Sequence, residues 1–103
     1  MSTATTEPTI IFPDWYDEQA EFEATARGYL SHIVVQTEGG SRYQVQFYDP
    51  VRLAQDLTSE TESGRGYLAE PNMIVLSEVS TENVRRAVHG LWREGFFKHL
   101  KPL

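Results

Sequence analysis

Hydrophobic and polar residues alternate with a period of two along two neighbouring segments in the first half of the chain. The first runs from Phe22 to Thr37 and is most regular from Tyr29 onward, and the second covers residues 42–48. Such alternation is typical of half-buried β-strands. Gly39 and Gly40 lie between the segments, and a two-residue hairpin turn favours glycine because both central residues need a positive φ. The pattern therefore predicts a β-hairpin.

The register of this hairpin decides which side chains share a face of the sheet. If the two glycines alone form the turn, Val34 lies opposite Val45 and His32 lies opposite Phe47. The face directed at the core then carries Leu30, His32, Val34, Tyr43, Val45 and Phe47. The second face carries Tyr29, Ser31, Ile33, Val35, Gln44, Gln46 and Tyr48. A slip of one residue would exchange the two faces.

Two later segments carry helix signals. Asp49 is a favoured N-cap and Pro50 suits the first helical position, so a helix is expected from residue 50 to a stop at Gly64. Its apolar stripe is Val51, Leu53, Ala54 and Leu57. Ser80 and Gly95 are expected to bound a second helix, whose buried stripe is Val84, Ala87, Val88, Leu91 and Trp92. Between the helices, residues 73–76 form an apolar run typical of a strand buried on both faces.

These elements predict an α+β fold in the order (β)ββαβα, in which the optional first strand is residues 9–12 before Pro13. Asp14 is suited to cap a short helical turn after it. Because each helix has one apolar stripe, we expect two layers: a three- to four-stranded sheet with the two helices packed mainly on one face. One helix on each face remains an alternative. Residues 1–8 are expected to be a disordered tail and residues 9–103 a single domain.

Composition narrows the possible functions. The 103 residues include no cysteine, which excludes disulfides, thiolate metal sites and cysteine nucleophiles and fits a reducing cytosol. The net charge is −6, so binding to the phosphates of nucleic acids is not expected. The first residues do not resemble a signal peptide, and no apolar stretch reaches the length of a membrane span. We therefore expect a cytoplasmic protein without membrane contact.

The charge is divided unevenly along the chain. Residues 1–27 contain six acids and one base, residues 28–83 contain eight acids and three bases, and residues 84–103 contain five bases and one acid. Two explanations stay open at this point. The acidic and basic ends attract each other within one fold, or one of them faces a partner.

Residues suited to catalysis or metal binding do not form a known motif. His32, His89 and His99 lack the spacings that place ligands on one face, and His32 is expected to be a hydrogen-bonded residue of the core. Four acidic residues would share one side of a helix: Asp14, Asp17, Glu18 and Glu21. They lack the ligand spacing of a calcium-binding loop. We expect no metal and no cofactor.

Two hypotheses of function follow. The first is a small acidic module that binds a protein partner, or a second copy of itself as a homodimer, through the second face, because exposed apolar patches usually mark interfaces. Residues 9–22 are expected to cover part of this face. The alternative is an enzyme or small-ligand-binding domain, whose pocket requires four residues to converge: His32, Tyr67, Glu70 and Asn72. Stacking of RNA bases on the tyrosines of the second face is disfavoured because few basic residues lie there.

Overall fold

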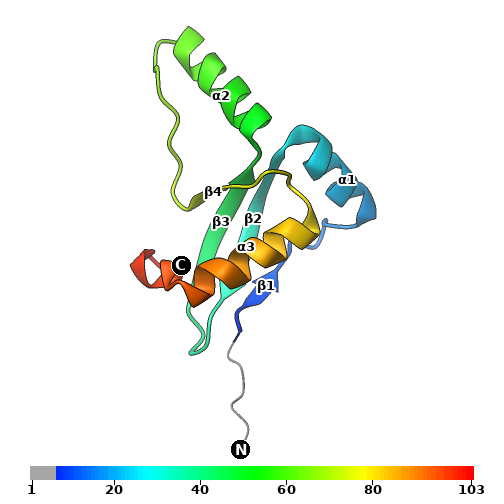
Figure 1. The fold of residues 1–103 in the computed structure, drawn as a ribbon, viewed down its shortest axis with the longest axis vertical. Coiled ribbons are helices and arrows are strands. Elements are labelled where there is room, and N and C mark those ends of the chain that lie inside the picture. Colours follow the sequence, from blue (N-terminus) through cyan, green and yellow to red (C-terminus); the bar gives the residue numbers. More distant parts are fainter. Residues whose placement is uncertain (1–6) are drawn as a thin grey trace, which may run out of the picture.

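The computed structural model describes residues 7–103 and shows within them one four-stranded sheet, three α-helices and a short 3₁₀ helix (Figure 1). In chain order the elements are β1 (Thr9–Ile11), α1 (Glu18–Arg27), β2 (Tyr29–Gln36), β3 (Arg42–Tyr48), α2 (Pro50–Glu62), β4 (Met73–Val75), α3 (Thr81–Arg93) and η1 (Phe96–His99). The strand order is β1-β2-β3-β4, with β3 and β4 parallel and the other pairs antiparallel. The predicted α+β class with one sheet is confirmed.

Helix α3 lies across one face of the sheet, which we call the helix-covered face (Figure 1). Ser80 caps this helix by accepting a hydrogen bond from the Asn83 amide, as the sequence predicts. The i,i+4 pair Val84 and Val88 is fully buried in one cluster with side chains of β2 and β3. Each side chain buried in this way contributes about 1.5–3 kcal/mol, so this contact is a main source of stability.

Helix α1 occupies residues that the alternating pattern assigned to the start of a strand. Asp17, rather than Asp14, is its N-cap, and its carboxylate accepts a hydrogen bond from the amide of Ala20 at 2.8 Å. Gly28, with φ of 70°, ends the helix. Ala24 is the residue that α1 buries. One buried alanine leaves no apolar stripe in the sequence, which is why the helix was not predicted.

The register of the hairpin differs by one residue from the predicted register. Gln36 pairs with Arg42, and the Thr37 amide donates to the Ser41 carbonyl at 2.9 Å. Three residues, 38–40, therefore lie between Thr37 and Ser41 in the turn, whereas the prediction placed only the two glycines there. The two glycines of the turn have φ of 90° and 88°, so they take the expected conformation within a longer loop.

The extra turn residue exchanges the faces of β2. Ile33 and Val35 are both 0% exposed and belong to the core on the helix-covered face, so their predicted position on the second face was wrong. Val34 is half-buried and lies beside Gln44 on the opposite face.

A β-bulge at His32 restores the first part of β2 to the core. The pairing shifts between Leu30 and Ile33, and His32 has φ of 64°. Leu30 thereby returns to the helix-covered face opposite Phe47 and is buried. His32 itself is exposed, so the prediction of a core histidine was wrong.

The face turned away from α3 is here called the open face. Its central row is Ile11, Val34 and Gln44, which are paired across β1, β2 and β3. The adjoining row contains Gln36 and Arg42, and the Arg42 Nε donates to the Gln36 amide oxygen at 3.0 Å. Side chains of the open face are thus apolar or amide-bearing in the middle and basic at one edge.

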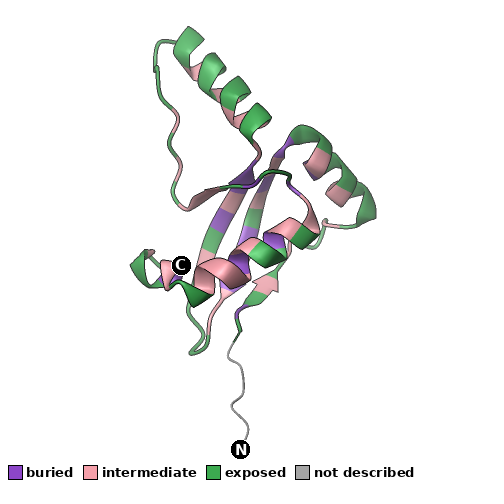
Figure 2. Cartoon of the chain, in the orientation of Figure 1, coloured by how far each residue is buried: buried purple, intermediate pink, exposed green. Residues whose placement is uncertain are grey.

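Helix α2 begins where the sequence predicts it, but it does not lie on the sheet. Asp49 accepts a hydrogen bond from the Arg52 amide at 2.7 Å, and Pro50 is in the first helical turn. Every residue of α2 is exposed or half-exposed, and the helix projects beyond the end of β3 (Figures 1 and 2). The Asp49 amide still donates to the Gly28 carbonyl at 2.8 Å. The chain therefore enters α2 directly from the sheet, without a loop that could turn it back over either face.

The segment before α1 packs against α3 rather than over the open face. The Tyr16 hydroxyl lies 2.6 Å from the Thr81 hydroxyl, and the Arg85 guanidinium lies over the Phe12 ring at 5.3 Å. The expectation that residues 9–22 cover the second face is therefore corrected for most of the segment, although Trp15 lines a hollow with Tyr29 and Ser31 of that face. Residues 1–6 of the predicted tail lie outside the described residues, and Pro8 is buried.

Candidate functional site

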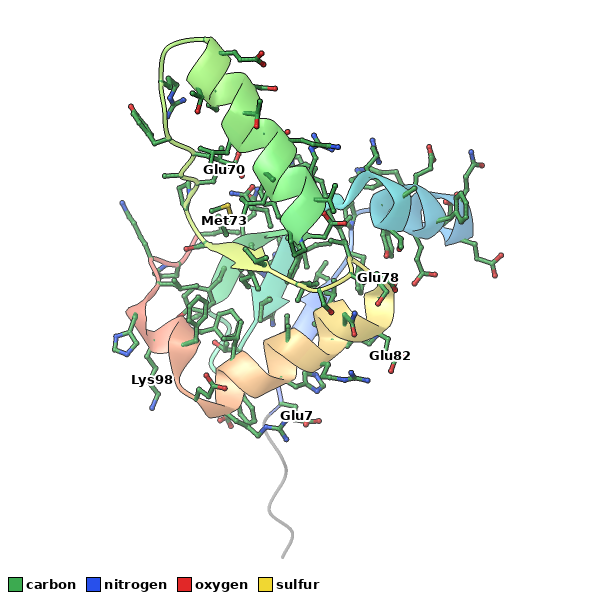
Figure 3. All side chains as sticks on the ribbon, turned by 45° about the horizontal axis from the view of Figure 1, so that its top comes forward. Glu7, Glu70, Met73, Glu78, Glu82 and Lys98 are labelled. Carbon is green, nitrogen blue, oxygen red and sulfur yellow. The ribbon has the colours of Figure 1, made fainter. Side chains whose placement is uncertain are left out.

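Three of the four residues of the predicted pocket lie close together in the chain, and two of them, Glu70 and Asn72, form hydrogen bonds with β3. They lie on the segment that returns from α2 to the sheet, on which Figure 3 labels Glu70 and Met73. The Glu70 carboxylate accepts a hydrogen bond from the Tyr48 hydroxyl at 2.7 Å. The Asn72 side chain donates to the Gln44 carbonyl at 2.7 Å. Tyr67 is exposed at the surface. These contacts fix the segment to β3.

The fourth residue, His32, belongs to a different surface hollow. His32 Nδ1 lies 2.8 Å from the Ser31 hydroxyl. The hollow has a volume of about 300 Å³ and is lined by Trp15, Arg27, Tyr29, Leu30, Ser31 and His32. Asn72 lines a separate hollow of about 360 Å³ with Gln44, Gln46, Pro71, Lys101 and Leu103. The two hollows do not bring the four predicted pocket residues together.

The residues predicted to bind a partner are divided between the core and the surface. Ile33 and Val35 lie in the core, and Tyr48 is only 3% exposed. Gln44 is exposed, whereas Tyr29 and Gln46 are half-exposed. The six residues therefore do not form one exposed patch.

Tyr48 is covered by neighbouring polar and aromatic groups. Its ring lies 4.8 Å from the Tyr29 ring, and the Arg52 guanidinium lies 5.2 Å from the centre of the Tyr29 ring. Burial raises the pKa of the Tyr48 hydroxyl, and the hydrogen bond to the Glu70 carboxylate raises this pKa further. The neutral phenol is thus the form that the folded chain stabilises.

The charged side of α2 is turned toward its own chain. Arg52 Nε lies 3.0 Å from a carboxylate oxygen of Asp56, one helical turn later. Glu60, a further turn along, lies 3.5 Å from Arg65 Nε in the returning segment. Residues 52, 56 and 60 share one side of the helix because they are spaced by four. All three are half-buried.

The opposite side of α2 is exposed and uncharged from Pro50 to Thr58, and Glu62, one turn after Thr58, lies at its end. Five residues line a shallow hollow of about 570 Å³ along this side, which we call the outer face of α2: Pro50, Val51, Ala54, Gln55 and Thr58. Val51 is 66% exposed. All five residues come from one helix, so this is an open, nearly flat surface and not an enclosed cavity.

The orientation of α2 differs from that expected for a helix on its own core. An amphipathic surface helix normally turns its apolar side inward and its charged side to water. Here Arg52, Asp56 and Glu60 face the chain together with half-buried Leu53, whereas Val51 and Ala54 face solvent. The sequence identified the apolar stripe but assigned it to the core. No signal in the sequence identifies this inward side, because charges spaced by four normally mark the side of a helix that faces solvent.

The fold defines the class of the protein as a small α+β domain with one mixed sheet and one projecting helix. Comparison of the chain with protein-family models, with curated proteins and with solved structures gives no match. Over residues 7–103, no helix combines the length and apolar character needed to cross a membrane. In the same range, no three histidine or carboxylate side chains are grouped as metal ligands would be.

Proposed function

We propose that this chain is a protein-interaction module and that the outer face of α2 is its docking surface. The orientation of α2 carries this proposal, because Val51 and Ala54 are exposed on its outer face while its charged side is occupied by the chain's own residues. Insertion of an amphipathic helix into an apolar groove is a common mode of protein recognition.

The energetics favour burial of this face by a partner. Complete burial of a valine side chain is worth about 1.5–3 kcal/mol, and Val51 on this face is 66% exposed. The helix is capped by Asp49 and braced by the Arg52–Asp56 ion pair before any partner binds. A preformed helix loses little conformational entropy on binding.

A protein is a better-matched partner than a nucleic acid or a small molecule. The net charge of −6 opposes binding to phosphates. The alternative of an enzyme or small-ligand binder has less support, because His32 and Asn72 line different hollows. A cytoplasmic location belongs to the same proposal, on the ground that the chain contains no cysteine.

Two adjacent substitutions test the docking surface. Thr58 lies on the outer face, and Ser59 is an exposed residue of the same helix beside that face. Thr58→Lys and Ser59→Lys should both leave the thermal midpoint nearly unchanged, because exposed substitutions usually change stability by less than about 0.5 kcal/mol. Proteins that co-purify with the wild type from the host should be lost with Thr58→Lys and retained with Ser59→Lys. Retention of the same proteins by both variants would contradict the proposal.

A further inference from the structure

We propose that the hollow beside the β-bulge of β2 is a second binding site of this chain and that it takes a small aromatic carboxylate, a planar ring that carries one negative charge. The hollow has a volume of about 300 Å³ and is lined by residues of α1 and β2, which Figure 1 shows joined end to end, and by Trp15. It is separate from the outer face of α2 and goes beyond the docking function proposed above. Of the four residues of the predicted pocket, this site uses only His32.

The β-bulge brings two polar side chains together at this hollow. Successive side chains of a regular strand point to opposite faces, yet the Ser31 hydroxyl lies 2.8 Å from His32 Nδ1. This contact forms because the pairing with β3 shifts between Leu30 and Ile33, and because His32 has φ of 64°. Bulges re-aim side chains in this way and are frequent beside active sites. Glycine adopts this φ without steric cost, so the backbone alone does not require a histidine here.

The Ser31–His32 pair can donate a hydrogen bond to a ligand in either neutral form of the histidine. When the hydroxyl donates to Nδ1, the imidazole carries its hydrogen on Nε2. When Nδ1 donates to the hydroxyl oxygen, the hydroxyl hydrogen is left for another acceptor. His32 is exposed, Ser31 is half-exposed, and both line the hollow. The pair therefore offers one donor to an acceptor group that enters the hollow.

Arg27 supplies a positive charge that its own chain does not neutralise. Among residues 7–103 its guanidinium forms no ion pair, whereas Arg52 and Arg65 each pair with an acid of the chain. No carboxylate lines the hollow, so the charge beside a ligand is positive although the whole chain has a net charge of −6. The planar guanidinium binds both oxygens of a carboxylate. One guanidinium balances the single charge of a carboxylate, but not the double charge of a phosphate.

Two aromatic side chains line the hollow and are held in place by their neighbours. The Trp15 side chain is 53% exposed, and its ring lies 6.3 Å from the ring of Tyr16, whose hydroxyl contacts Thr81. The Tyr29 ring lies 4.8 Å from the Tyr48 ring. Aromatic rings pack favourably on one another, so these two side chains suit a planar ligand. Aromatic walls with a few convergent polar groups are typical of small-ligand sites.

Titration of the isotope-labelled chain with phenylacetate, followed by NMR, tests this site. Phenylacetamide has the same shape without the charge, and acetate has the charge without the ring. The chain contains two tryptophans, so the indole N–H signal of Trp92, which lies in α3, is an internal control for that of Trp15. The variant Trp15→Phe assigns the two signals.

The expected result is a saturable shift of the Trp15 indole signal and of the Ser31 and His32 amide signals, while the Trp92 signal stays in place. The dissociation constant should be about 1 mM, the affinity expected of a ligand with about ten non-hydrogen atoms. Phenylacetamide and acetate should each bind about tenfold more weakly or worse, because each lacks one of the two groups that the hollow recognises.

Arg27→Gln and Arg93→Gln form a matched pair of variants. Both arginines are exposed and lie in the last turn of a helix, and the end of α3 lies away from the junction of α1 and β2 (Figure 1). Arg27→Gln should weaken phenylacetate binding about tenfold or more, because a charge-assisted hydrogen bond is lost. Arg93→Gln should leave the affinity unchanged. His32→Gly keeps the positive φ and removes the imidazole, so it should weaken binding several-fold.

Thermal midpoints of the variants close to that of the wild type would show that a loss of binding is not a loss of fold. The absence of a saturable shift up to tens of millimolar phenylacetate would overturn the proposal, as would shifts confined to residues outside the hollow. Equal affinity for phenylacetamide, or equal affinities of Arg27→Gln and Arg93→Gln for phenylacetate, would also overturn it. None of these outcomes bears on the docking surface of α2, which Thr58→Lys tests.

Discussion

The hairpin register can be tested by comparing alanine substitutions at two adjacent residues of β2. Ile33 is 0% exposed in the core, whereas Val34 is half-buried on the open face. Ile33→Ala removes three carbon atoms, worth about 0.8 kcal/mol each in transfer free energy, and leaves a cavity. The expected loss in free energy of unfolding is about 2–5 kcal/mol. Val34→Ala removes two carbons that already contact water in part, and we expect a loss below about 1 kcal/mol.

Both variants would be unfolded in urea and followed by far-ultraviolet circular dichroism. A shift of the midpoint without a change of slope reports a change in stability alone. The register with a two-residue turn places Val34 in the core and Ile33 on the opposite face, so it predicts the reverse order of losses. A larger loss for Val34→Ala than for Ile33→Ala would therefore refute the register described above.

Three further predictions concern the ends of α1 and the buried phenol. Gly28→Ala should destabilise the fold by more than about 1 kcal/mol, because φ is 70° there and a Cβ would lie 2.4 Å from the Asp49 carboxylate; a thermal midpoint equal to that of the wild type would contradict this. Asp17→Ala should cost about 1 kcal/mol in chemical denaturation, and Asp17→Ser should restore most of it; equal losses would exclude a capping role. The pKa of Tyr48 is raised in the folded chain, so the unfolded chain loses this proton first as the pH rises above about 10. Stability should therefore fall above that pH, and the fall should be smaller in Tyr48→Phe; an unchanged fall would exclude Tyr48 as its cause.

The sequence predicted the starts of α2 and α3 correctly, because a capping hydrogen bond depends only on residues that are close in the chain. Asp49 and Ser80 accept the capping hydrogen bonds expected of them. The turn glycines have the positive φ that the sequence predicts. The register could not be derived from them, because the same glycines serve a two-residue turn and the longer turn between Thr37 and Ser41.

Long-range contacts account for what the sequence did not predict. Leu30 and Ile33 share a face only because the bulge at His32 shifts the pairing between them. The apolar stripe of α2 was identified, but its exposure depends on how Asp49 is held beside Gly28 at the end of the sheet. This contact joins residues that are distant in the chain, so the spacing of hydrophobic residues along the sequence does not predict it.

The candidate site could be predicted only in part for the same reason. Gln44 lies on the exposed face to which the sequence assigned it. Ile33 and Val35 were assigned to that face through the register, and the slip of one residue moved both into the core. Ile33→Lys would therefore place a charge in the core and unfold the chain instead of testing an interface.

Burial of the outer face of α2 by a protein partner can be measured through thiol reactivity. Thr58→Cys and Ser59→Cys place a single thiol on the outer face or immediately beside it, and both positions are exposed in the isolated chain. As the protein concentration rises, or when host extract is added, the Thr58→Cys thiol should react several-fold more slowly with a maleimide, while the Ser59→Cys thiol should change little. Equal reaction rates of the two thiols under every condition would contradict the assignment of this face as the docking surface.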